Sequence, residues 1–373
     1  MAKQNAKRLV RKKFRCKNGF PAEIRRSPKS SRQCAITASR RKTWPKTNRF
    51  RKPIIPGIAQ DRVMSANHVF DATIIGAGPA GVSCAVWLQQ LGFQAVLVDL
   101  NATCGGLQLR NPYTNTWIAS SANAHGADVA QALHENAVRH GVALRLSRKA
   151  RQARKEGEHW CVRLDDGEDL KSRILVLAGG VTPKSGGFAA RASLLVGPGP
   201  QVANTDFNGT RVAILGGGDN AFENHTFVRE RGAATVHIYA RSIRARAEML
   251  ERVAHDDVIV GDFDVDASTN TVNGQRYDHL LVLFGYEVSK GALLGLEPAL
   301  RPDGFVLTDS NCRTSIPGVY AIGELAQRAH PCCITAMADG VVAAKDIQRT
   351  LEQTRRRRYM GALKRGASLL GIA

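Results

Sequence analysis

The sequence predicts an α/β protein built from two Rossmann-like, three-layer nucleotide-binding domains. Two observations carry this prediction. An apolar run at 72–75 leads into the turn Gly76-Ala77-Gly78-Pro79-Ala80-Gly81, and an apolar run at 211–215 leads into Gly216-Gly217-Gly218-Asp219-Asn220-Ala221. A segment with helical composition comes after each turn. A strand, a glycine turn and a helix in this order form the phosphate-binding part of a dinucleotide fold.

The first turn has the spacing GxGxxG and leads into a predicted helix over 82–91. Its first glycine permits a tight turn, its second lets the backbone approach a pyrophosphate, and its third lets helix and strand pack closely. The N-terminus of the helix then offers free N–H groups and a positive dipole end to the phosphates. We expect cofactor contacts from Gly76, Gly78, Pro79, Ala80 and Gly81.

An acidic residue stands at the distance that this fold requires. Asp99 lies 23 residues after Gly76, at the end of an apolar run over 95–98 that predicts the second strand. A carboxylate in this place accepts a hydrogen bond from a ribose hydroxyl. The first site is therefore predicted to bind an adenine dinucleotide that carries no additional phosphate.

The second turn has the spacing GxGxxA, and no acid stands in the corresponding position after it. Its predicted binding residues are Gly216, Gly218, Asp219, Asn220 and Ala221. After the next predicted strand, 234–239, the chain carries arginines where the acid would stand, with Arg241 and Arg246 as the candidates. An arginine pairs with a 2′-phosphate through charge-assisted bonds, so the second site is predicted to bind NADPH; a solvated basic stretch is the alternative. Two such sites together predict a flavoprotein that takes hydride from a nicotinamide.

The positive charge of the chain belongs to its two ends. The formal net charge is +21, of which residues 1–63 contribute +18 and residues 355–365 contribute +6, so the remainder carries −3. No apolar run is long enough to cross a membrane, and no secretory signal is present. The eight cysteines form neither a CxxC pair nor a zinc-ligand spacing, so no metal site is predicted and a reducing, cytoplasmic location is expected.

The basic leader, residues 1–63, has too little apolar periodicity to build a core. We favour a start of the mature protein at Met64, just before the first strand. A transit peptide, which would direct the protein to an organelle, is the second interpretation. A nucleic-acid-binding arm and a plain disordered tail are the others. The few aromatic residues make nucleic-acid binding the weaker hypothesis.

The order of motifs resembles the thioredoxin-reductase-like class of pyridine nucleotide-disulfide oxidoreductases over roughly residues 68–350. The resemblance rests on five segments, which are Gly76–Gly81, Gly105-Gly106-Leu107-Gln108, Leu175–Gly180, Gly216–Ala221 and Pro317–Glu324. It implies FAD contacts from Gly106, Gln108, Gly323 and Glu324. It also implies that an NADPH domain, 183–287, is inserted into an FAD domain formed by 68–182 and 288–350, and that the protein is a homodimer.

Three departures from that family stand out. The stretch that would carry the redox CxxC of a thioredoxin reductase is Gly199-Pro200-Gln201-Val202, which has no sulfur. Gly179 replaces a threonine, and Glu324 replaces an aspartate of the flavin motif. The segments 211–221 and 283–289 are similar to the ferredoxin/flavodoxin–NADP reductase branch, which lacks the CxxC. Electron transfer to a small carrier protein, a ferredoxin or flavodoxin, is therefore our first hypothesis.

A pair of cysteines supports a second hypothesis. By the resemblance, Cys332 and Cys333 fall at the N-terminus of a helix aimed at the flavin ring. A helix N-terminus and a nearby imidazolium, such as that of His330, lower the pKa of a cysteine. Cys332 would then be a reactive thiolate and the protein a thiol or disulfide reductase; a buried, structural cysteine is the alternative. A third hypothesis is a flavin- and nucleotide-binding sensor without turnover.

The C-terminal end is predicted to be a helix over 341–353 followed by a basic tail, 354–373. The tail carries Arg355 to Arg358 and Tyr359. A solvated basic tail, a docking surface for an acidic electron carrier, and a membrane-surface contact are the three interpretations. By the resemblance, Tyr359 is the aromatic residue available to cover the flavin of a partner subunit.

Overall fold

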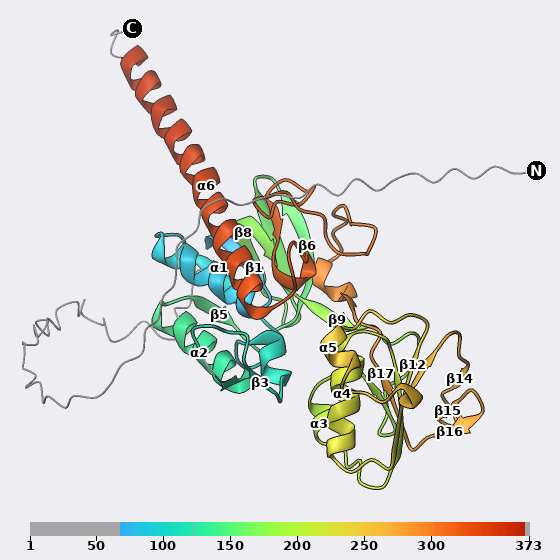
Figure 1. Cartoon of the computed structure of the whole chain (residues 1–373). Coiled ribbons are helices and arrows are strands. Elements are labelled where there is room, and N and C mark those ends of the chain that lie inside the picture. The colour runs from blue at the N-terminus through green and yellow to red at the C-terminus, as the bar shows by residue number, and fades with distance from the viewer. Residues whose placement is uncertain (1–67, 122, 370–373) are drawn as a thin grey trace, which may run out of the picture. The chain divides into compact units, whose positions relative to one another are not determined.

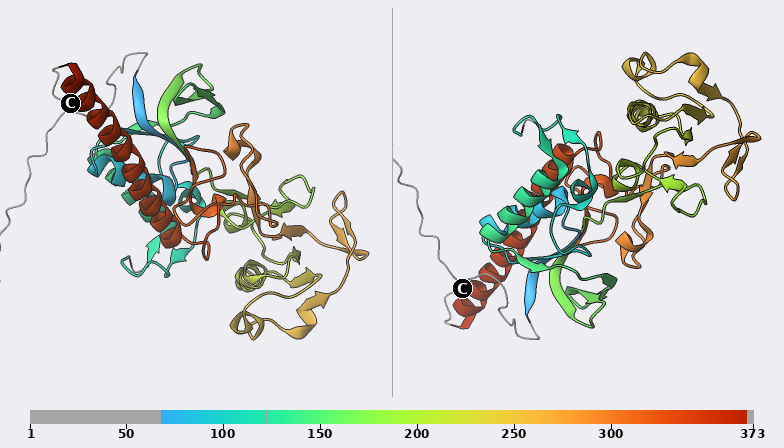
Figure 2. Two further views of the ribbon diagram at one scale, coloured as in Figure 1. Left: turned by 90° about the horizontal axis from the view of Figure 1, so that it is seen from above. Right: turned by 90° about the horizontal axis from the view of Figure 1, so that it is seen from below.

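The computed structural model describes residues 68–121 and 123–369, with the backbone alone at 290 and over 357–369. The predicted leader, 1–63, the start at Met64 and the final residues of the tail lie outside the described residues. Figure 1 shows the described elements, and Figure 2 shows them from above and below. Two parallel sheets dominate the fold, as the two glycine turns predict.

The first sheet has the strand order β5-β2-β1-β8-β7-β6, and β19 pairs with β8. The strands β5, β2, β1, β8 and β19 are parallel, whereas β7 and β6 add an antiparallel edge. The bounds are β1 Val69–Ile75, β2 Ala95–Val98, β5 Ala143–Arg145, β6 Ala150–Glu156, β7 His159–Leu164, β8 Asp169–Leu177 and β19 Val319–Ala321. The apolar run at 72–75 is a central strand because it is buried on both faces.

The second sheet is parallel throughout, in the order β10-β17-β11-β12-β13. Its bounds are β10 Leu194–Val196, β11 Arg211–Leu215, β12 Thr235–Ala240, β13 Val258–Val260 and β17 His279–Val282. All of its strands lie in the chain between β8 and β19 of the first sheet. This topology confirms the predicted fold class, in which one nucleotide-binding fold is inserted into the other.

Three small sheets complete the strands. The ribbon β9 (Val181–Pro183) and β18 (Tyr286–Val288) is antiparallel and forms where the chain leaves the first sheet and where it returns. A meander comes after β13, and a hairpin precedes α2. Their bounds are β14 Val265–Asp266, β15 Thr271–Val272, β16 Gln275–Arg276, β3 Thr114–Asn115 and β4 Ala124–His125.

The helices cover the sheets and carry the glycine turns at their N-termini. The α-helices are α1 Pro79–Gln90, α2 Gly126–Arg139, α3 Pro200–Ala203, α4 Asp219–Glu230, α5 Ala247–Leu250 and α6 Cys333–Leu369. The 3₁₀ helices are η1 Gly106–Arg110, η2 His255–Asp257, η3 Lys290–Leu293 and η4 Gly323–Leu325. Each large sheet has one hydrophobic cluster on either side.

Helix α6 corrects the predicted limits of the closing helix. The sequence places that helix over 341–353, but α6 runs without interruption from Cys333 to Leu369. Its first turns pack along α1 (Figures 1 and 2), where the Ser83 hydroxyl donates to the Met337 carbonyl at 2.8 Å. A Cβ at Gly340 would lie 2.4 Å from the Ala80 carbonyl oxygen. The start at Cys333 agrees with the helix N-terminus that the family resemblance implies at Cys332 and Cys333. The correction concerns 354–369, predicted as a tail, which continues the helix because most of its residues are good helix formers.

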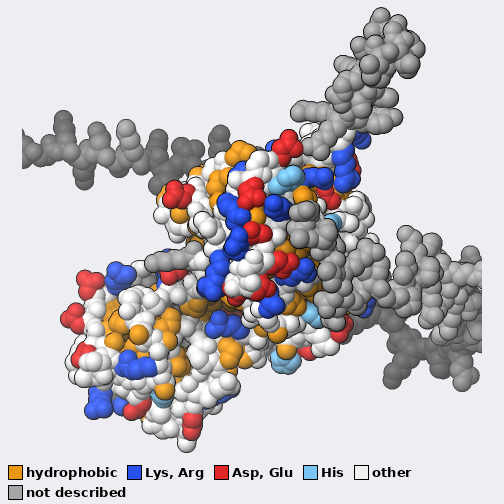
Figure 3. Space-filling model, turned by 180° about the vertical axis from the view of Figure 1, so that it is seen from behind, with side chains coloured by type: hydrophobic (Ala, Val, Ile, Leu, Met, Phe, Trp, Pro, Cys, Tyr) orange, Lys and Arg blue, Asp and Glu red, His pale blue; other side chains and the backbone are white. Residues whose placement is uncertain are grey.

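Basic side chains of the described residues lie among acidic ones. Figure 3 shows basic and acidic side chains interspersed on one face. Salt bridges such as Arg145–Glu168 and Arg173–Asp71 pair many of the arginines. In the described part of the chain, no helix is both long and apolar enough to span a membrane.

Candidate functional site

The first glycine turn connects β1 to α1 and packs as tightly as its spacing requires. Gly76 has a φ of +110°, and a Cβ there would lie 2.2 Å from the Ala178 carbonyl oxygen. A Cβ at Gly81 would lie 1.9 Å from the Gly76 carbonyl oxygen. Contacts within the protein therefore leave no room for a side chain at either glycine. A Cβ at Gly78 would meet only the Gly106 Cα, at 3.7 Å, so no contact among the described residues demands a glycine there.

Asp99 comes directly after β2 and lies against this turn. Its Oδ2 accepts a hydrogen bond from the backbone N–H of Ala77 at 2.6 Å, and its Oδ1 accepts two from Asn101, from the backbone N–H and the side-chain amide, each at 2.8 Å. The acid therefore holds the glycine turn in position. Each carboxylate oxygen has two lone pairs, so Oδ2 can accept one further bond from a ribose hydroxyl.

The η1 segment closes over the same turn. The N–H of Gly105 donates to the Ala77 carbonyl at 2.8 Å, and a Cβ at Gly106 would lie 2.9 Å from the Gly78 Cα. One buried polar atom of this segment, Gln108 Oε1, has no partner within the described residues. A buried polar atom without a hydrogen bond costs about 1–3 kcal/mol, so this predicted residue has an acceptor that a ligand could satisfy. The Tyr113 hydroxyl also lacks a described partner, but its ring packs on Phe227 of α4, with 5.5 Å between the ring centroids.

The segment after β19 brings the predicted flavin motif to the same place. Gly323 begins η4, and a Cβ there would lie 2.9 Å from the Ala80 side chain. Its N–H donates to the Asp339 carboxylate at 3.1 Å, and Arg328 donates to the other oxygen of that carboxylate at 2.9 Å. Burial raises the pKa of Asp339 and of the neighbouring Glu324.

Helix α6 begins at this point with a capping arrangement. The Cys332 sulfur accepts the Thr335 N–H at 3.5 Å, and the Thr335 hydroxyl accepts the Cys332 N–H at 3.2 Å. Partial burial would raise the pKa of the Cys332 thiol, but hydrogen bonds from the Thr335 hydroxyl and the amides of Thr335 and Ile334 outweigh it and lower this pKa. Burial raises the pKa of Cys333 to about 11.

Cys332 differs in this respect from the other cysteines of the described chain. Burial raises the pKa of Cys104 and of Cys312 to about 12 in each case, and it raises that of Cys84 and Cys161 as well. His330, which sequence reasoning placed beside the thiol as an imidazolium, is exposed, and its carbonyl accepts the Thr335 hydroxyl.

The second glycine turn connects β11 to α4 and repeats the pattern of the first. A Cβ at Gly216, whose φ is +150°, would lie 2.4 Å from the Leu283 carbonyl oxygen. At Gly217 it would lie 2.1 Å from the Ser242 carbonyl oxygen. At Gly218 a Cβ would meet no described atom within 4 Å. In both turns the middle glycine of the motif lacks the close contacts that fix the glycines before it, as a ligand-contacting backbone would.

The arginines after β12 lie in different environments. Arg246 is tied to the second turn, because its Nε donates to Asp219 Oδ2 at 2.7 Å and its N–H donates to Asp219 Oδ1 at 2.8 Å. Partial burial would raise the pKa of Asp219, but the bonds from Arg246 lower it. Arg241 is exposed. The Asn220 carbonyl accepts a hydrogen bond from the side-chain amide of Asn224, and Ala221 is buried in the core.

The predicted residues therefore form two groups. The first turn, Asp99, η1, η4 and the N-terminus of α6 meet at the carboxyl end of the first sheet. The second turn and Arg246 meet at the carboxyl end of the second sheet. Ligands of open α/β sheets bind at this end of the strands. No group of three potential metal-ligating side chains occurs among the residues with described positions.

The sequence missed two residues of the first group, Asp339 and Arg328. The signal for Asp339 was an acid in the first turns of an otherwise apolar helix segment, 333–344. Arg328 carried no signal, because its partners come from other elements.

Comparisons with known proteins agree with this geometry. Residues 197–340 match the family described as pyridine nucleotide-disulphide oxidoreductase. The thioredoxin reductase of Peptoclostridium acidaminophilum is 23% identical over 312 residues, which cover 76% of this chain and 98% of the relative. A ferredoxin–NADP reductase of Ignicoccus hospitalis is 25% identical over 304 residues, covering 73% and 95%.

A solved structure supports the fold. The thioredoxin reductase of Lactococcus lactis superposes with a TM-score of 0.64 at 19% identity, over 76% of this chain and 99% of that protein. At this identity the likeness concerns architecture. The matched segment and relatives covered almost end to end, taken with the two glycine turns, support a likeness of this chain to the thioredoxin-reductase-like pyridine nucleotide-disulphide oxidoreductase family.

Proposed function

We propose that this protein is an FAD-dependent NADPH oxidoreductase that passes hydride from NADPH to FAD and then delivers electrons to an acceptor. The observation that carries the proposal is the repeated glycine turn. Close contacts within the protein fix Gly76 and Gly81 in the first copy and Gly216 and Gly217 in the second, whereas Gly78 and Gly218 have no such contacts and leave the space that a pyrophosphate would fill. Relatives named thioredoxin reductase and ferredoxin–NADP reductase support the same chemistry.

The residues of the first group fit FAD. The turn at 76–81 and the N-terminus of α1 would hold its pyrophosphate, and Asp99 its ribose. Gln108 would satisfy its unpartnered Oε1 on the cofactor. When bound, FAD accepts a hydride and releases the electrons to the acceptor. The protein supplies the binding, the orientation and the N-terminus of α6 beside Gly323 and Glu324.

The residues of the second group fit NADPH. The turn at 216–221 and the N-terminus of α4 would hold the pyrophosphate, and Arg246 and Arg241 would bind the 2′-phosphate. The Asp219 carboxylate orients the Arg246 guanidinium from one side. A fixed guanidinium loses less side-chain entropy on binding, which favours recognition of NADPH over NADH.

The domains and assembly are part of the same proposal. We assign 68–182 with 288–350 to FAD binding and 183–287 to NADPH binding, in a homodimer located in the cytoplasm. The β9–β18 ribbon marks both passages of the chain between these regions.

Our first choice of acceptor is a small electron-carrier protein such as a ferredoxin or flavodoxin. The segment 199–202, where α3 begins, carries no sulfur, so a disulfide relay of the thioredoxin reductase kind has no residues there. A thiol or disulfide acceptor is the second candidate, and the lowered pKa of Cys332 favours it.

An anaerobic titration of the purified full chain with NADPH, followed by the flavin spectrum, tests the function. Bleaching by one NADPH per flavin supports a single redox centre and a carrier-protein acceptor. Consumption of two NADPH per flavin, with a long-wavelength charge-transfer band, supports a redox-active thiol. A colourless protein that binds no flavin contradicts the proposal, and flavin that NADPH does not reduce favours a sensor.

A further inference from the structure

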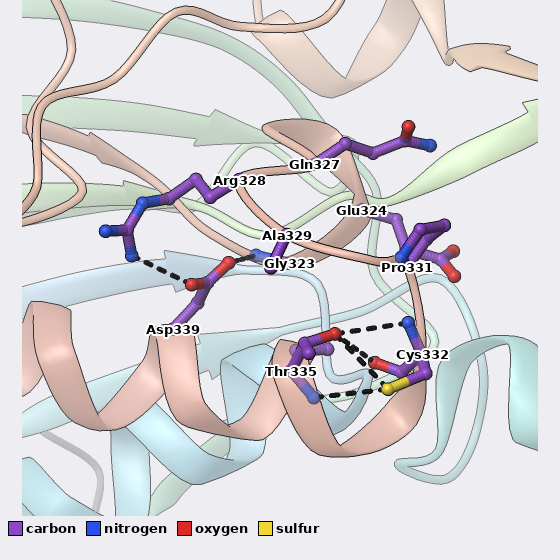
Figure 4. Close-up of a pocket in the computed structure, with 10 residues that line it drawn as sticks. Gly323, Glu324, Gln327, Arg328, Ala329, Pro331, Cys332, Thr335 and Asp339 are labelled. Atoms are coloured by element: carbon purple, nitrogen blue, oxygen red, sulfur yellow. Dashed lines mark hydrogen bonds and ion pairs between the residues drawn. The ribbon is translucent and has the colours of Figure 1, made fainter. Parts of the chain in front are cut away.

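The two glycine turns differ in how closely the surrounding chain approaches them. Near the first turn, η4 and the start of α6 enclose a cavity of only about 10 Å³, and Figure 4 shows the Arg328–Asp339 pair among the residues that line it. At the second turn a Cβ on Gly218 would meet no described atom within 4 Å, and Arg241 after β12 is exposed. The elements of the inserted sheet therefore leave the second site more open than the first.

The hairpin of β3 and β4 brings a segment from outside the inserted sheet to this second site. Tyr113, directly before β3, packs on Phe227 of α4 with 5.5 Å between the ring centroids. Trp117, in the turn of the hairpin, has the guanidinium carbon of Arg246 at 5.9 Å from the centre of its ring. Arg246 is in turn bonded to Asp219, the first residue of α4. Two separate contacts thus place the hairpin against α4 and beside the predicted phosphate-binding turn.

The backbone of Trp117 is held in place, whereas its ring is uncovered. The Trp117 N–H donates to Asn115 Oδ1 at 3.2 Å, and the next residue, Ile118, is buried in a hydrophobic cluster. The Trp117 residue is nevertheless 79% exposed, the largest fraction among the exposed large hydrophobic residues of the described chain. An indole on an anchored backbone offers a large flat surface and loses little conformational entropy when a planar ligand covers it.

Arg246 and Trp117 together offer the two kinds of contact that an adenosine 2′-phosphate requires. A guanidinium is planar, so its face can stack on an indole while its edge donates hydrogen bonds. Asp219 occupies the Nε of that edge at 2.7 Å, whereas Nη2 lies 3.9 Å from Glu223 and makes no hydrogen bond within the described residues. The Nη groups remain for a phosphate, and the indole matches the flat base that the same nucleoside carries.

We propose that Trp117 stacks on the adenine of the NADPH bound at the second turn. The β3–β4 hairpin would then complete a nucleotide site whose phosphate contacts come from the inserted sheet. This inference rests on the proposed function, because it takes NADPH to be the ligand of that turn. Arg246 would distinguish NADPH from NADH through the 2′-phosphate, whereas Trp117 would bind the part that the two nucleotides share.

The test measures binding and not turnover, so its readout does not depend on flavin reduction. Isothermal titration calorimetry on the full chain gives the dissociation constants of NADP⁺, NAD⁺ and 2′,5′-ADP. Trp117→Ala removes the ring, and Trp117→Phe keeps a smaller one. Trp87→Ala is the matched control, because it removes the other exposed indole of the described residues, on α1. Flavin content and thermal unfolding are recorded for every variant.

Trp117→Ala should weaken all three ligands by a similar factor, because all three carry adenine. Loss of one stacked base predicts a factor of about 5- to 100-fold. Trp117→Phe should recover part of the affinity, and Trp87→Ala should leave it unchanged. Quenching of tryptophan fluorescence by 2′,5′-ADP should disappear in Trp117→Phe and persist in Trp87→Ala.

Three results would overturn the inference and leave the proposed function standing. The first is unchanged affinity in Trp117→Ala. The second is a loss confined to NADP⁺ and 2′,5′-ADP, because Trp117 would then act only through Arg246 on the 2′-phosphate. The third is tighter binding, because the indole would then compete with the nucleotide for the guanidinium. A parent chain that keeps its flavin but binds neither NADP⁺ nor NAD⁺ contradicts the proposed function, and this inference fails with it.

Discussion

The Asp99 carboxylate accepts a hydrogen bond from the backbone N–H of Ala77 at 2.6 Å, joining the end of β2 to the glycine turn after β1. The acid that the sequence predicts to bind a ribose therefore also fixes the loop that would surround a pyrophosphate. A negative charge at this position strengthens that hydrogen bond.

Replacement of Asp99 by Asn should weaken FAD binding more than it affects folding. A charge-assisted hydrogen bond contributes about 1.5–3 kcal/mol, which corresponds to about 10- to 100-fold in affinity. Flavin content after dialysis and the dissociation constant of added FAD measure the effect. Asp303→Asn, at an exposed ion pair with Arg301, is the matched control. Equal flavin affinity in both variants would contradict the assignment.

The two middle glycines should separate the two nucleotide sites. Gly78→Ala places its Cβ in ordinary contact, 3.7 Å from the Gly106 Cα, and Gly218→Ala meets no described atom within 4 Å. We expect both variants to fold. Gly78→Ala should lower flavin content, whereas Gly218→Ala should keep the flavin and raise the KM for NADPH by at least about tenfold.

Gly81→Ala is the contrasting variant. Its Cβ would lie 1.9 Å from the Gly76 carbonyl oxygen, so the turn and α1 must separate. Overpacking of this kind costs about 1–3 kcal/mol or more, and we expect a lower thermal midpoint even with excess FAD. A Gly218→Ala protein that lost its fold, or a Gly81→Ala protein of full stability, would show that these contacts are wrongly assigned.

Arg246→Ala and Arg241→Ala should each reduce the preference for NADPH over NADH. Loss of a charge-assisted contact to the 2′-phosphate predicts about a 10- to 100-fold increase in the KM for NADPH, with the KM for NADH nearly unchanged. Steady-state reduction of an artificial acceptor with each nucleotide gives the ratio. Arg252→Ala, whose guanidinium pairs with Glu248 one turn along, serves as the control. An unchanged ratio would assign these arginines to the solvated surface instead.

Acid should destabilise the edge of the first sheet through Asp169. Hydrogen bonds from Arg163 lower the pKa of Asp169 to about 2, overcoming the effect of burial. Because the folded-state pKa is below the unfolded one, this contribution to stability is present above about pH 4 and is lost as the pH falls towards 2. The dependence of urea unfolding on pH between 6 and 2 should therefore be flatter for Asp169→Asn than for the parent chain. Parallel curves for the two proteins would refute the shift.

The sequence predicted those parts of the site that depend on local geometry. Gly76 and Gly81 were predicted from their spacing between a strand and a helix, although the contact that demands Gly76 comes from Ala178, after β8. An unbroken apolar run makes 72–75 recognisable as a central strand. Asp99 was predicted because the distance along the chain from glycine turn to acid is set by one strand–helix–strand unit.

Contacts between distant segments escaped prediction for the converse reason. Asp339 bonds to Gly323, and Gly340 lies against Ala80 of α1, but neither relationship can be deduced from composition or periodicity nearby. The predicted imidazolium effect of His330 on Cys332 likewise depended on a side-chain position that adjacency in the sequence does not determine. Gly179, noted as replacing a threonine, is explained only by the fold, since a Cβ there would lie 2.7 Å from Ala292.

The chain returns to the first sheet only after the inserted sheet, and this order affects how the protein folds during its synthesis. Strand β8 ends at Leu177, yet its parallel neighbour β19 is synthesised only after the whole second sheet. Until then α1 lacks α6, and the core on that side stays open to solvent. The inserted sheet, with all its pairings local to one stretch of chain, can fold on the ribosome first. We therefore expect nascent chains that end before β19 to need chaperone protection over their N-terminal half, and chains that end after α6 to be released from it.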